Sequence, residues 1–234
     1  MTAQTDPITG PRIPLTRERV LQAAVKVADE GGLQALTMRN LAQALGVEAM
    51  SLYYHVANKE AVLDGVVDVI AGEINRAVAD LDQPVKPDAW KRAMRARILE
   101  ARTVLLRHPW APEVLETRTN MSPAVVKYYD GLLGIFRKGG FSYDLAHHAL
   151  HALGSRAIGF TQELFDPDEA DSDADATNDM LEQMADQLPY LVQMMQEIVH
   201  DDPDSTLGWC DDQTEFEFGL DLTLDGLERM QAPA

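Results

Sequence analysis

The stretch from Thr37 to Lys59 constrains the fold of this chain more than any other part. It reads TMRNLAQALGVEAMSLYYHVANK, with one short apolar run on each side of Gly46. Thr37 is a good N-cap for a helix over 38–45, and Gly46 can take the left-handed conformation that ends it. A second short helix is expected near 48–54. The pattern therefore predicts two helices joined by a tight turn, which is the helix-turn-helix motif.

A preceding helix completes a three-helix unit. Thr16 can cap this helix, Gly31 and Gly32 can end it, and its apolar residues recur at helical spacing. Once the expected core positions are removed, small, hydroxyl and aromatic side chains remain on the second helix of the motif. These are Ala49, Met50, Ser51, Tyr53, Tyr54 and His55. Such groups suit contact with base edges and phosphates. The alternative interpretation is a three-helix subdomain with surface tyrosines and no DNA.

Helical periodicity continues along the rest of the chain and predicts an all-α fold. Helices are expected at 59–79, 88–108, 112–118, 123–138, 142–165, 179–199 and from Thr214 onward. The last segment, EFEFGLDLTLDGLERM, also alternates as a strand would. Nothing else in the chain offers a strand to pair with it, so a helix is favoured. Its small residues share one face and would let another helix approach closely: Gly219, Thr223 and Gly226.

We expect a flexible arm at 1–14, a helix-turn-helix DNA-binding domain at 15–60 and a larger helical domain at 61–234. The larger domain contains DPDEADSDADATND at 166–179. This segment lacks the glycine and the terminal glutamate of an EF-hand. A solvated, mobile acidic loop is therefore favoured over a calcium loop or a partner-binding tail.

The formal net charge of −18 is unevenly distributed. Up to Glu60 the chain has six Lys or Arg and six Asp or Glu, so this first quarter is neutral. No Lys or Arg occurs between Arg156 and Arg229. Because exposed charges are screened beyond about 8–10 Å at physiological salt, the acidic remainder argues only weakly against DNA binding by the first quarter.

Other features narrow the class of protein. The single cysteine, Cys210, excludes an internal disulfide framework and fits a reducing cytoplasm. Neither a signal peptide nor an apolar run of membrane-spanning length is found, so a cytoplasmic protein without a membrane partner is expected. No Ser-His-Asp order, nucleotide loop or metal motif is present, so neither an enzyme nor a cofactor is predicted.

The segment LTRERVLQAAVKVADEGGLQALTMRNLAQALGVEAMSLYYHVANKEAVLDGV closely resembles the N-terminal domain of the TetR family of bacterial repressors. GLLGIFRKGGFS and FEFGLDLTLDGLERM resemble, more weakly, the ligand-binding and dimerisation domain of the tetracycline-repressor branch. The resemblance implies a homodimer that binds double-stranded operator DNA and responds to a small-molecule effector. It also implies that the helix from Ser142 and the last helix form a four-helix dimer interface.

In the family, DNA is contacted by the start of the second helix, by the recognition helix and by the start of the fourth. Carried over, the DNA-binding residues are Thr37, Arg39, Ala49, Met50, Ser51, Tyr53, His55 and Lys59. Lys59 adds an amine where free helical N–H groups can also bind a phosphate. Tetracycline repressors carry Gln and Pro where this chain has Ala49 and Met50. A different operator is therefore expected.

The resemblance also implies a small apolar effector that binds one state of the dimer better than the other. Tetracycline-binding members use two histidines where this chain has Asn75 and Val114, so magnesium-tetracycline is disfavoured. The candidate ligand-binding residues are Asn75, Trp110, Val114, Leu132, Phe136, His151 and Phe160. Aromatic and apolar residues at these spacings are more often part of an ordinary core than ligand contacts.

His147, His148 and His151 form a cluster in HHALH, with Asp144 one turn before His148. The spacing supplies at most half of a zinc ligand set, so a polar patch is favoured and no metal is predicted. Protonation of the cluster could tune dimer or ligand affinity. The leading hypothesis remains a ligand-responsive repressor. The alternative is a DNA-binding regulator that is controlled by a partner protein and has no small-molecule inducer.

Overall fold

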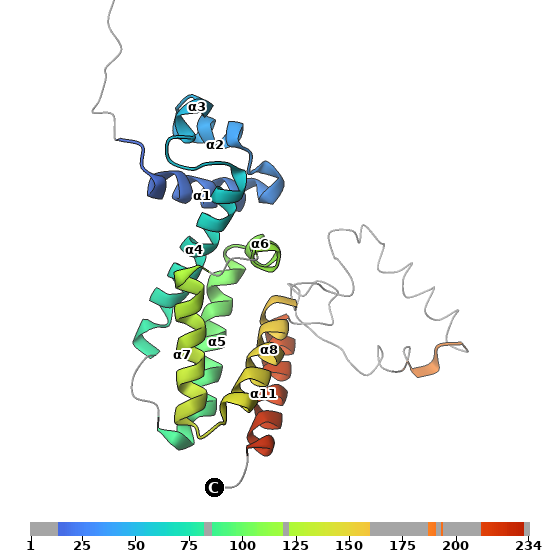
Figure 1. Ribbon diagram of the computed structural model, residues 1–234. Helices are drawn as coiled ribbons and strands as arrows, with labels where there is room; N and C mark the ends of the chain where they lie inside the picture. Colours follow the sequence, from blue (N-terminus) through green and yellow to red (C-terminus); the bar gives the residue numbers. More distant parts are fainter. Residues whose placement is uncertain are drawn as a thin grey trace, which may run out of the picture. The chain divides into compact units, whose positions relative to one another are not determined.

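The computed structural model describes residues 14–81, 86–118, 122–159, 187–190, 193 and 212–231. Within these residues the chain forms helices and no strand, which confirms the all-α prediction (Figure 1). The chain divides into two compact units, one made of residues 1–82 and 100–131 and the other of 83–99 and 132–234. No described helix is long and apolar enough to cross a membrane.

The first unit begins with α1 (Arg17–Ala35), α2 (Met38–Leu45), α3 (Ala49–Leu52) and α4 (Lys59–Ala77). Side-chain caps set three of the helix starts. Oxygens of Thr16, Thr37 and Asn58 accept hydrogen bonds from backbone N–H groups three residues on, at 3.2, 3.1 and 2.8 Å. Such caps each contribute about 1 kcal/mol. Gly31 and Gly32 leave helical geometry inside α1, at the point where the sequence predicts its end.

The second helix of the helix-turn-helix, α3, is shorter than predicted: it ends at Leu52 rather than near residue 54. The N–H groups of His55 and Val56 both donate to the carbonyl of Leu52, at 2.8 and 2.9 Å. The chain therefore turns after α3 and returns Val56 to the core. This turn leads directly to Asn58, which caps α4.

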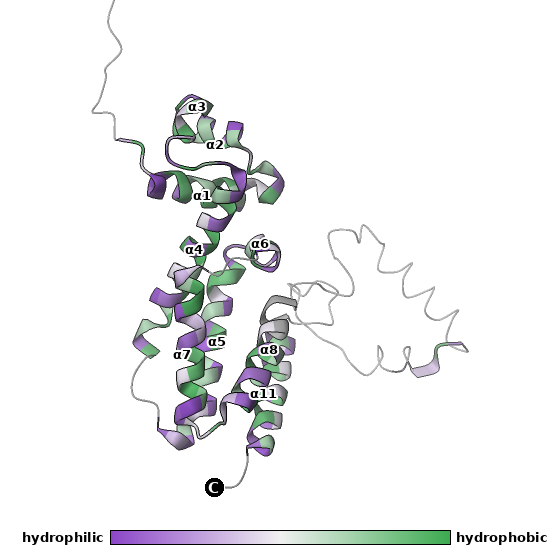
Figure 2. Ribbon diagram, viewed as in Figure 1, coloured by the Kyte–Doolittle hydropathy of each residue, from purple (hydrophilic) through white to green (hydrophobic). Residues whose placement is uncertain are grey.

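After α4 come two 3-10 turns, η1 (Ala79–Leu81) and η2 (Pro87–Ala89), and then α5 (Trp90–Leu106) and α6 (Ala111–Thr117). One continuous hydrophobic core joins α6 and the end of α5 to the helix-turn-helix. Its buried members include Val20, Leu41, Leu52, Val66, Val104 and Val114. Figure 2 shows hydrophobic residues recurring along α4, which runs through this core. Each buried aliphatic side chain contributes roughly 1.5–3 kcal/mol, so α6 is firmly attached to the first unit.

The second unit contains α8 (Tyr143–Gly159), α11 (Asp212–Met230), the start of α5 and the end of α7 (Pro123–Lys138). α8 and α11 lie side by side (Figure 1). An aromatic cluster of Trp90, Phe136 and Phe141 fills the other part of the unit. The Phe141 ring lies 4.6 Å from Trp90 and 4.9 Å from Phe136, between ring centroids.

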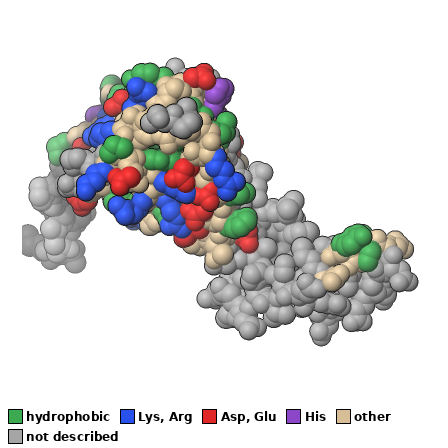
Figure 3. All heavy atoms as spheres, turned by 90° about the horizontal axis from the view of Figure 1, so that it is seen from below, with side chains coloured by type: hydrophobic (Ala, Val, Ile, Leu, Met, Phe, Trp, Pro, Cys, Tyr) green, Lys and Arg blue, Asp and Glu red, His purple; other side chains and the backbone are tan. Residues whose placement is uncertain are grey.

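Ion pairs attach α11 to α5 in the second unit. Arg95 donates to Asp221 at 2.7 Å and to Glu217 at 2.5 Å, while Lys91 binds Asp225 and Glu228. Asp225 first, and then Glu228, raise the pKa of Lys91, and the Lys91 ammonium lowers the pKa of Asp225. Figure 3 shows basic and acidic side chains next to one another on the face that it presents. Exposed pairs of this kind stabilise only modestly.

The final segment is a helix, as favoured over a strand, and its buried residues Phe216, Leu220, Leu224 and Leu227 follow the helical period. Several predictions lie outside the described residues. These are the arm except Pro14, the acidic loop 166–179, most of the helix expected at 179–199, and Phe160.

Candidate nucleic-acid interface

The turn between α2 and α3 has the geometry that a helix-turn-helix requires. Gly46 is left-handed, with φ of 66° and ψ of 35°, and its N–H donates to the carbonyl of Gln43 at 3.1 Å. The N–H of Val47 donates to Ala42 at 3.0 Å. A side chain at residue 46 would strain this backbone, which explains the glycine. A hollow of about 1010 Å³ lies beside the turn and is lined by residues including Arg19, Gln43, Glu48 and Ser51.

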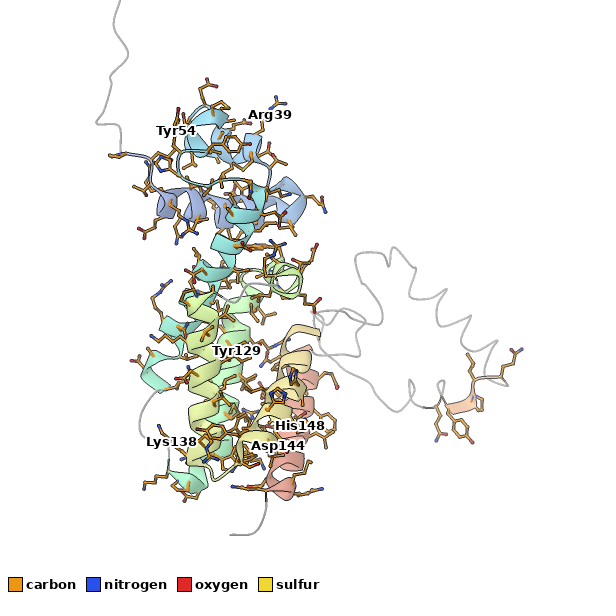
Figure 4. All side chains as sticks on the ribbon, in the orientation of Figure 1. Arg39, Tyr54, Tyr129, Lys138, Asp144 and His148 are labelled. Atoms are coloured by element: carbon orange, nitrogen blue, oxygen red, sulfur yellow. The ribbon has the colours of Figure 1, made fainter. Side chains whose placement is uncertain are left out.

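Residues 49–55, in α3 and the turn that follows it, include one side chain buried in the core and others that face outward. Leu52 is 0% exposed and anchors α3 in the core, whereas Met50 is 72% exposed and Tyr54 is 89% exposed. Tyr53 is also exposed, and Ala49, Ser51 and His55 are half-buried. Arg39 is exposed on the first turn of α2, and Figure 4 shows Arg39 and Tyr54 in this part of the chain. Six of the eight predicted DNA-binding residues thus lie on α2 or within three residues of α3's end.

The remaining two predicted residues sit at helix starts. Thr37 is exposed but uses its hydroxyl to cap α2, so its side chain accepts one hydrogen bond from the protein already. Lys59 is exposed at the first position of α4. The next residue, Glu60, is an acid that would repel a phosphate. Arg118 donates to Glu60 at 2.6 Å and to Asp64 at 3.4 Å, and Glu60 raises the pKa of Arg118.

Arg118 directly follows α6, so its ion pair connects the end of α6 to the start of α4. A second connection lies before α6. The Nδ1 atom of His108 is 2.7 Å from Asp29 Oδ1, and the Nε1–H of Trp110 donates to the same oxygen at 2.7 Å. Asp29 belongs to α1. Both ends of α6 are therefore tied to helices of the helix-turn-helix part, a feature that sequence reasoning missed.

Three predicted ligand-binding residues lie in the first unit. Val114 is buried on α6, and Trp110 is buried with its indole N–H committed to Asp29. Asn75 on α4 is half-buried, and its Nδ2 donates to the carbonyl of Ala124 on α7 at 2.7 Å. Its Oδ1 is buried and has no hydrogen-bond partner among the described residues. A buried carbonyl oxygen without a partner is costly, so this atom is suited to accept a hydrogen bond from a ligand.

Other predicted ligand-binding residues lie in the second unit. Leu132 and Phe136 are buried, and Phe136 belongs to the aromatic cluster with Trp90 and Phe141. His151 is exposed on α8, with its ring centroid 4.6 Å from that of His147. His148 lies 3.9 Å from Asp144 on the exposed face of α8 (Figure 4). Among the described residues, no group of three or more His, Cys, Asp or Glu is arranged to hold a metal ion.

The geometry defines the class of protein: a helix-turn-helix protein in which the core of the motif is shared with α4 and α6. Residues 20–66 match the model of the family "Bacterial regulatory proteins, tetR family", and residues 83–231 match "Tetracyclin repressor-like, C-terminal domain". The chain belongs to the TetR family of transcriptional regulators and has a tetracycline-repressor-like C-terminal domain. It is a DNA-binding repressor of the helix-turn-helix class.

Named relatives agree with this assignment. The chain is 30% identical over 230 residues to the HTH-type transcriptional repressor DrrR1 of Streptomyces coeruleorubidus, covering 97% of this chain and 82% of that protein. It is 31% identical over 218 residues to the tetracycline repressor protein class D of Escherichia coli, covering 92% and 89%. The structure of the Streptomyces coelicolor protein ActR in complex with actinorhodin matches with a TM-score of 0.75 at 25% identity, covering 94% and 100%.

Proposed function

We propose that the chain is a homodimeric repressor that leaves its operator when a small, largely apolar effector binds. Residues 15–60 would read the DNA, and residues 61–234 would bind the effector and the second protomer. The observation that carries this proposal is the single core shared by the helix-turn-helix and α6. Because a packed core transmits displacement rather than absorbing it, a ligand that moved α6 would also move the DNA-reading helices.

The proposed DNA contacts are the eight residues predicted from the sequence, together with Tyr54, whose side chain is the most exposed large apolar one in the described chain. Arg39 and Lys59 would bind phosphates, which fixes the position of the protein on DNA. Met50 is the residue best placed to touch a base, because it is exposed near the start of α3. Neutralisation of Glu60 by Arg118 supports a phosphate contact at Lys59.

The proposed effector contacts are the residues predicted from the sequence, with Asn75 as the polar member. Its unpartnered Oδ1 supports an effector that presents a hydroxyl or N–H group on an otherwise apolar body. Val114 would provide the contact with α6. The related protein ActR has been solved with actinorhodin, which supports a small organic molecule as the effector here.

The proposed dimer interface is the face formed by α8 and α11. Phe218 and Leu222 are exposed one turn apart on α11, at 66% and 64%. Gly219, Thr223 and Gly226 lie beside them and are half-buried. Exposed apolar side chains next to small residues favour close packing of a second copy of these helices.

A gel-shift series tests the proposal directly. Purified protein is titrated into DNA that flanks its own gene, and bound complexes are then challenged with a library of small organic molecules. Sequence-specific binding near 10⁻⁸–10⁻¹¹ M is the range typical of specific regulators. Release of the complex by one class of compound supports the effector-controlled repressor. Specific binding that no small molecule releases, together with release by a protein fraction, would instead support the partner-controlled regulator.

Lys59→Ala is expected to weaken binding to operator and to random DNA by the same factor. The reason is that a lysine on a phosphate contributes counterion release and reads no base. The slope of log affinity against log salt should become shallower by about one unit. Binding isotherms at four or more salt concentrations measure this slope.

Lys138→Ala is the matched control, since Lys138 is an exposed lysine at the end of α7 in the second unit. Its salt slope should equal that of the wild type. If Lys59→Ala left the slope unchanged, or weakened the operator alone, the phosphate contact at the start of α4 would be wrong.

A further inference from the structure

His108 is a buried imidazole placed between two carboxylates from different helices. Its side chain is 9% exposed, with Nδ1 at 2.7 Å from Asp29 Oδ1 of α1 and Nε2 at 3.3 Å from Glu73 Oε2 of α4. His108 itself lies in the short connection between α5 and α6, which we call the α5–α6 corner. One ring therefore bridges three segments of the first unit.

The protonation state of the ring determines whether it can donate a hydrogen bond to one carboxylate or to both. A neutral imidazole has one N–H and one lone pair, whereas an imidazolium has two N–H donors. In the neutral form, donation to Asp29 leaves the lone pair of Nε2 facing the carboxylate of Glu73. In the protonated form, both carboxylates receive a charge-assisted hydrogen bond, and such bonds are stronger than neutral ones.

Other groups also contact the two carboxylates around the ring. The indole N–H of Trp110 donates to Asp29 Oδ1 at 2.7 Å and so fixes that carboxylate in place. The Nη2 atom of Arg107 lies 3.9 Å from Glu73 Oε2. Asp29, Glu73 and Arg107 are the charged groups that reach the bridge from α1, from α4 and from the residue that follows α5.

We propose that His108 is a proton-dependent link between the α5–α6 corner and the DNA-reading helices, so that protonating it tightens operator binding. α2 packs on α1, α3 packs on α2, and buried residues of all three helices belong to one core. A link that holds α1 to the corner limits the orientations that α3 samples, and a preorganised surface binds with a smaller entropy cost. Histidine is the side chain that most readily gains a proton on mild acidification, so operator binding by this regulator is expected to depend on pH. This inference rests on the DNA-binding role of the protein.

The test compares operator affinity at pH 6 and pH 8 for the wild type, His108→Gln and Asp29→Asn. We expect the wild type to bind on the order of tenfold more tightly at pH 6, and each variant to lose most of that ratio. His55→Gln is required in parallel, because His55 lies in the proposed DNA interface and its own titration would alter affinity. Arg118→Gln is the matched control, because it removes the ion pair between Arg118 and Glu60 at the other end of α6 and leaves His108 in place. The ratio of operator affinities at pH 6 and pH 8 should therefore be the same in Arg118→Gln as in the wild type.

A second measurement does not depend on DNA. The imidazole ring of His108, assigned by its absence in His108→Gln, should show by NMR a change of protonation in full-length protein over the pH range in which operator affinity changes. No change of protonation at His108 over that range, a wild-type pH ratio in His108→Gln, or tighter binding at pH 8 would each overturn the inference. Failure to bind any DNA at either pH would instead contradict the regulatory role itself.

Discussion

Replacing Leu52 by alanine is expected to lower the free energy of unfolding of the first unit by about 2–5 kcal/mol. Leu52 is fully buried, and its side chain attaches α3 to the core shared with α1 and α2. Removing it leaves a cavity beneath a helix of only four residues. Such a helix has little stability of its own, so operator binding should be lost together with the stability. Urea unfolding followed by circular dichroism, and gel shifts on the same samples, measure the two losses.

Met50→Ala is the matched comparison, because Met50 is two residues away in α3 and largely exposed. Its stability should change by no more than about 0.5 kcal/mol. Base preference at one operator position should change by roughly 1–3 kcal/mol. Equal losses for Met50→Ala on operator and random DNA would show that α3 is not the recognition helix. A stable Leu52→Ala protein that still binds would contradict the role of the core in holding it.

Gly139→Ala is expected to destabilise the second unit by about 1–3 kcal/mol. A methyl group at this position would lie 2.7 Å from Cγ and 2.8 Å from Cβ of Trp90. These atoms are close to the Trp90 backbone, and its ring is enclosed by Phe136 and Phe141. The tryptophan therefore cannot swing aside, and either α5 or the end of α7 must shift. Thermal unfolding followed by the fluorescence of the tryptophans would detect the change.

Gly134→Ala tests whether this loss is due to the steric contact or to glycine chemistry in general. Gly134 lies within α7, five residues before Gly139, and a methyl group there would meet nothing within 4 Å. Alanine should be neutral or stabilise by roughly 0.5–1 kcal/mol, because it favours helical geometry. Equal behaviour of the two variants would argue against tight packing of Gly139 on Trp90.

The helix boundaries near the proposed DNA-binding surface could be predicted because their signals are local. Thr37, Gly46 and Asn58 each act within a few residues, through a cap or a left-handed turn. The end of α3 was harder, because Tyr53 and Tyr54 continue a helical pattern. It is the return of Val56 to the core that stops the helix, and this depends on packing rather than on propensity.

The hydrogen bonds and ion pairs at the two ends of α6 could not be predicted from the sequence. Asp29 and His108 are 79 residues apart, and Glu60 and Arg118 are 58 apart. Nothing in the local pattern pairs them, since each pair exists only once α1, α4 and α6 share a core. For the same reason, the sequence could not show whether Phe136 is a pocket residue or, as is more common for such residues, a core residue. Its contacts with Trp90 and Phe141 become visible only in the folded chain.

The continuous core from α1 to α6 has a consequence for building hybrid regulators. The boundary expected at residue 60 lies inside one compact unit, whose hydrophobic core includes residues on both sides of it. A graft that ended there would leave the apolar faces of α1 and α2 without α4 and would expose them to water. A functional hybrid should therefore include α4 together with the helix-turn-helix, and the residues that pack between α4 and α6 should be matched to each other. In this family member, the helices that are proposed to bind DNA share their hydrophobic core with α4 and α6, so they cannot be transferred alone.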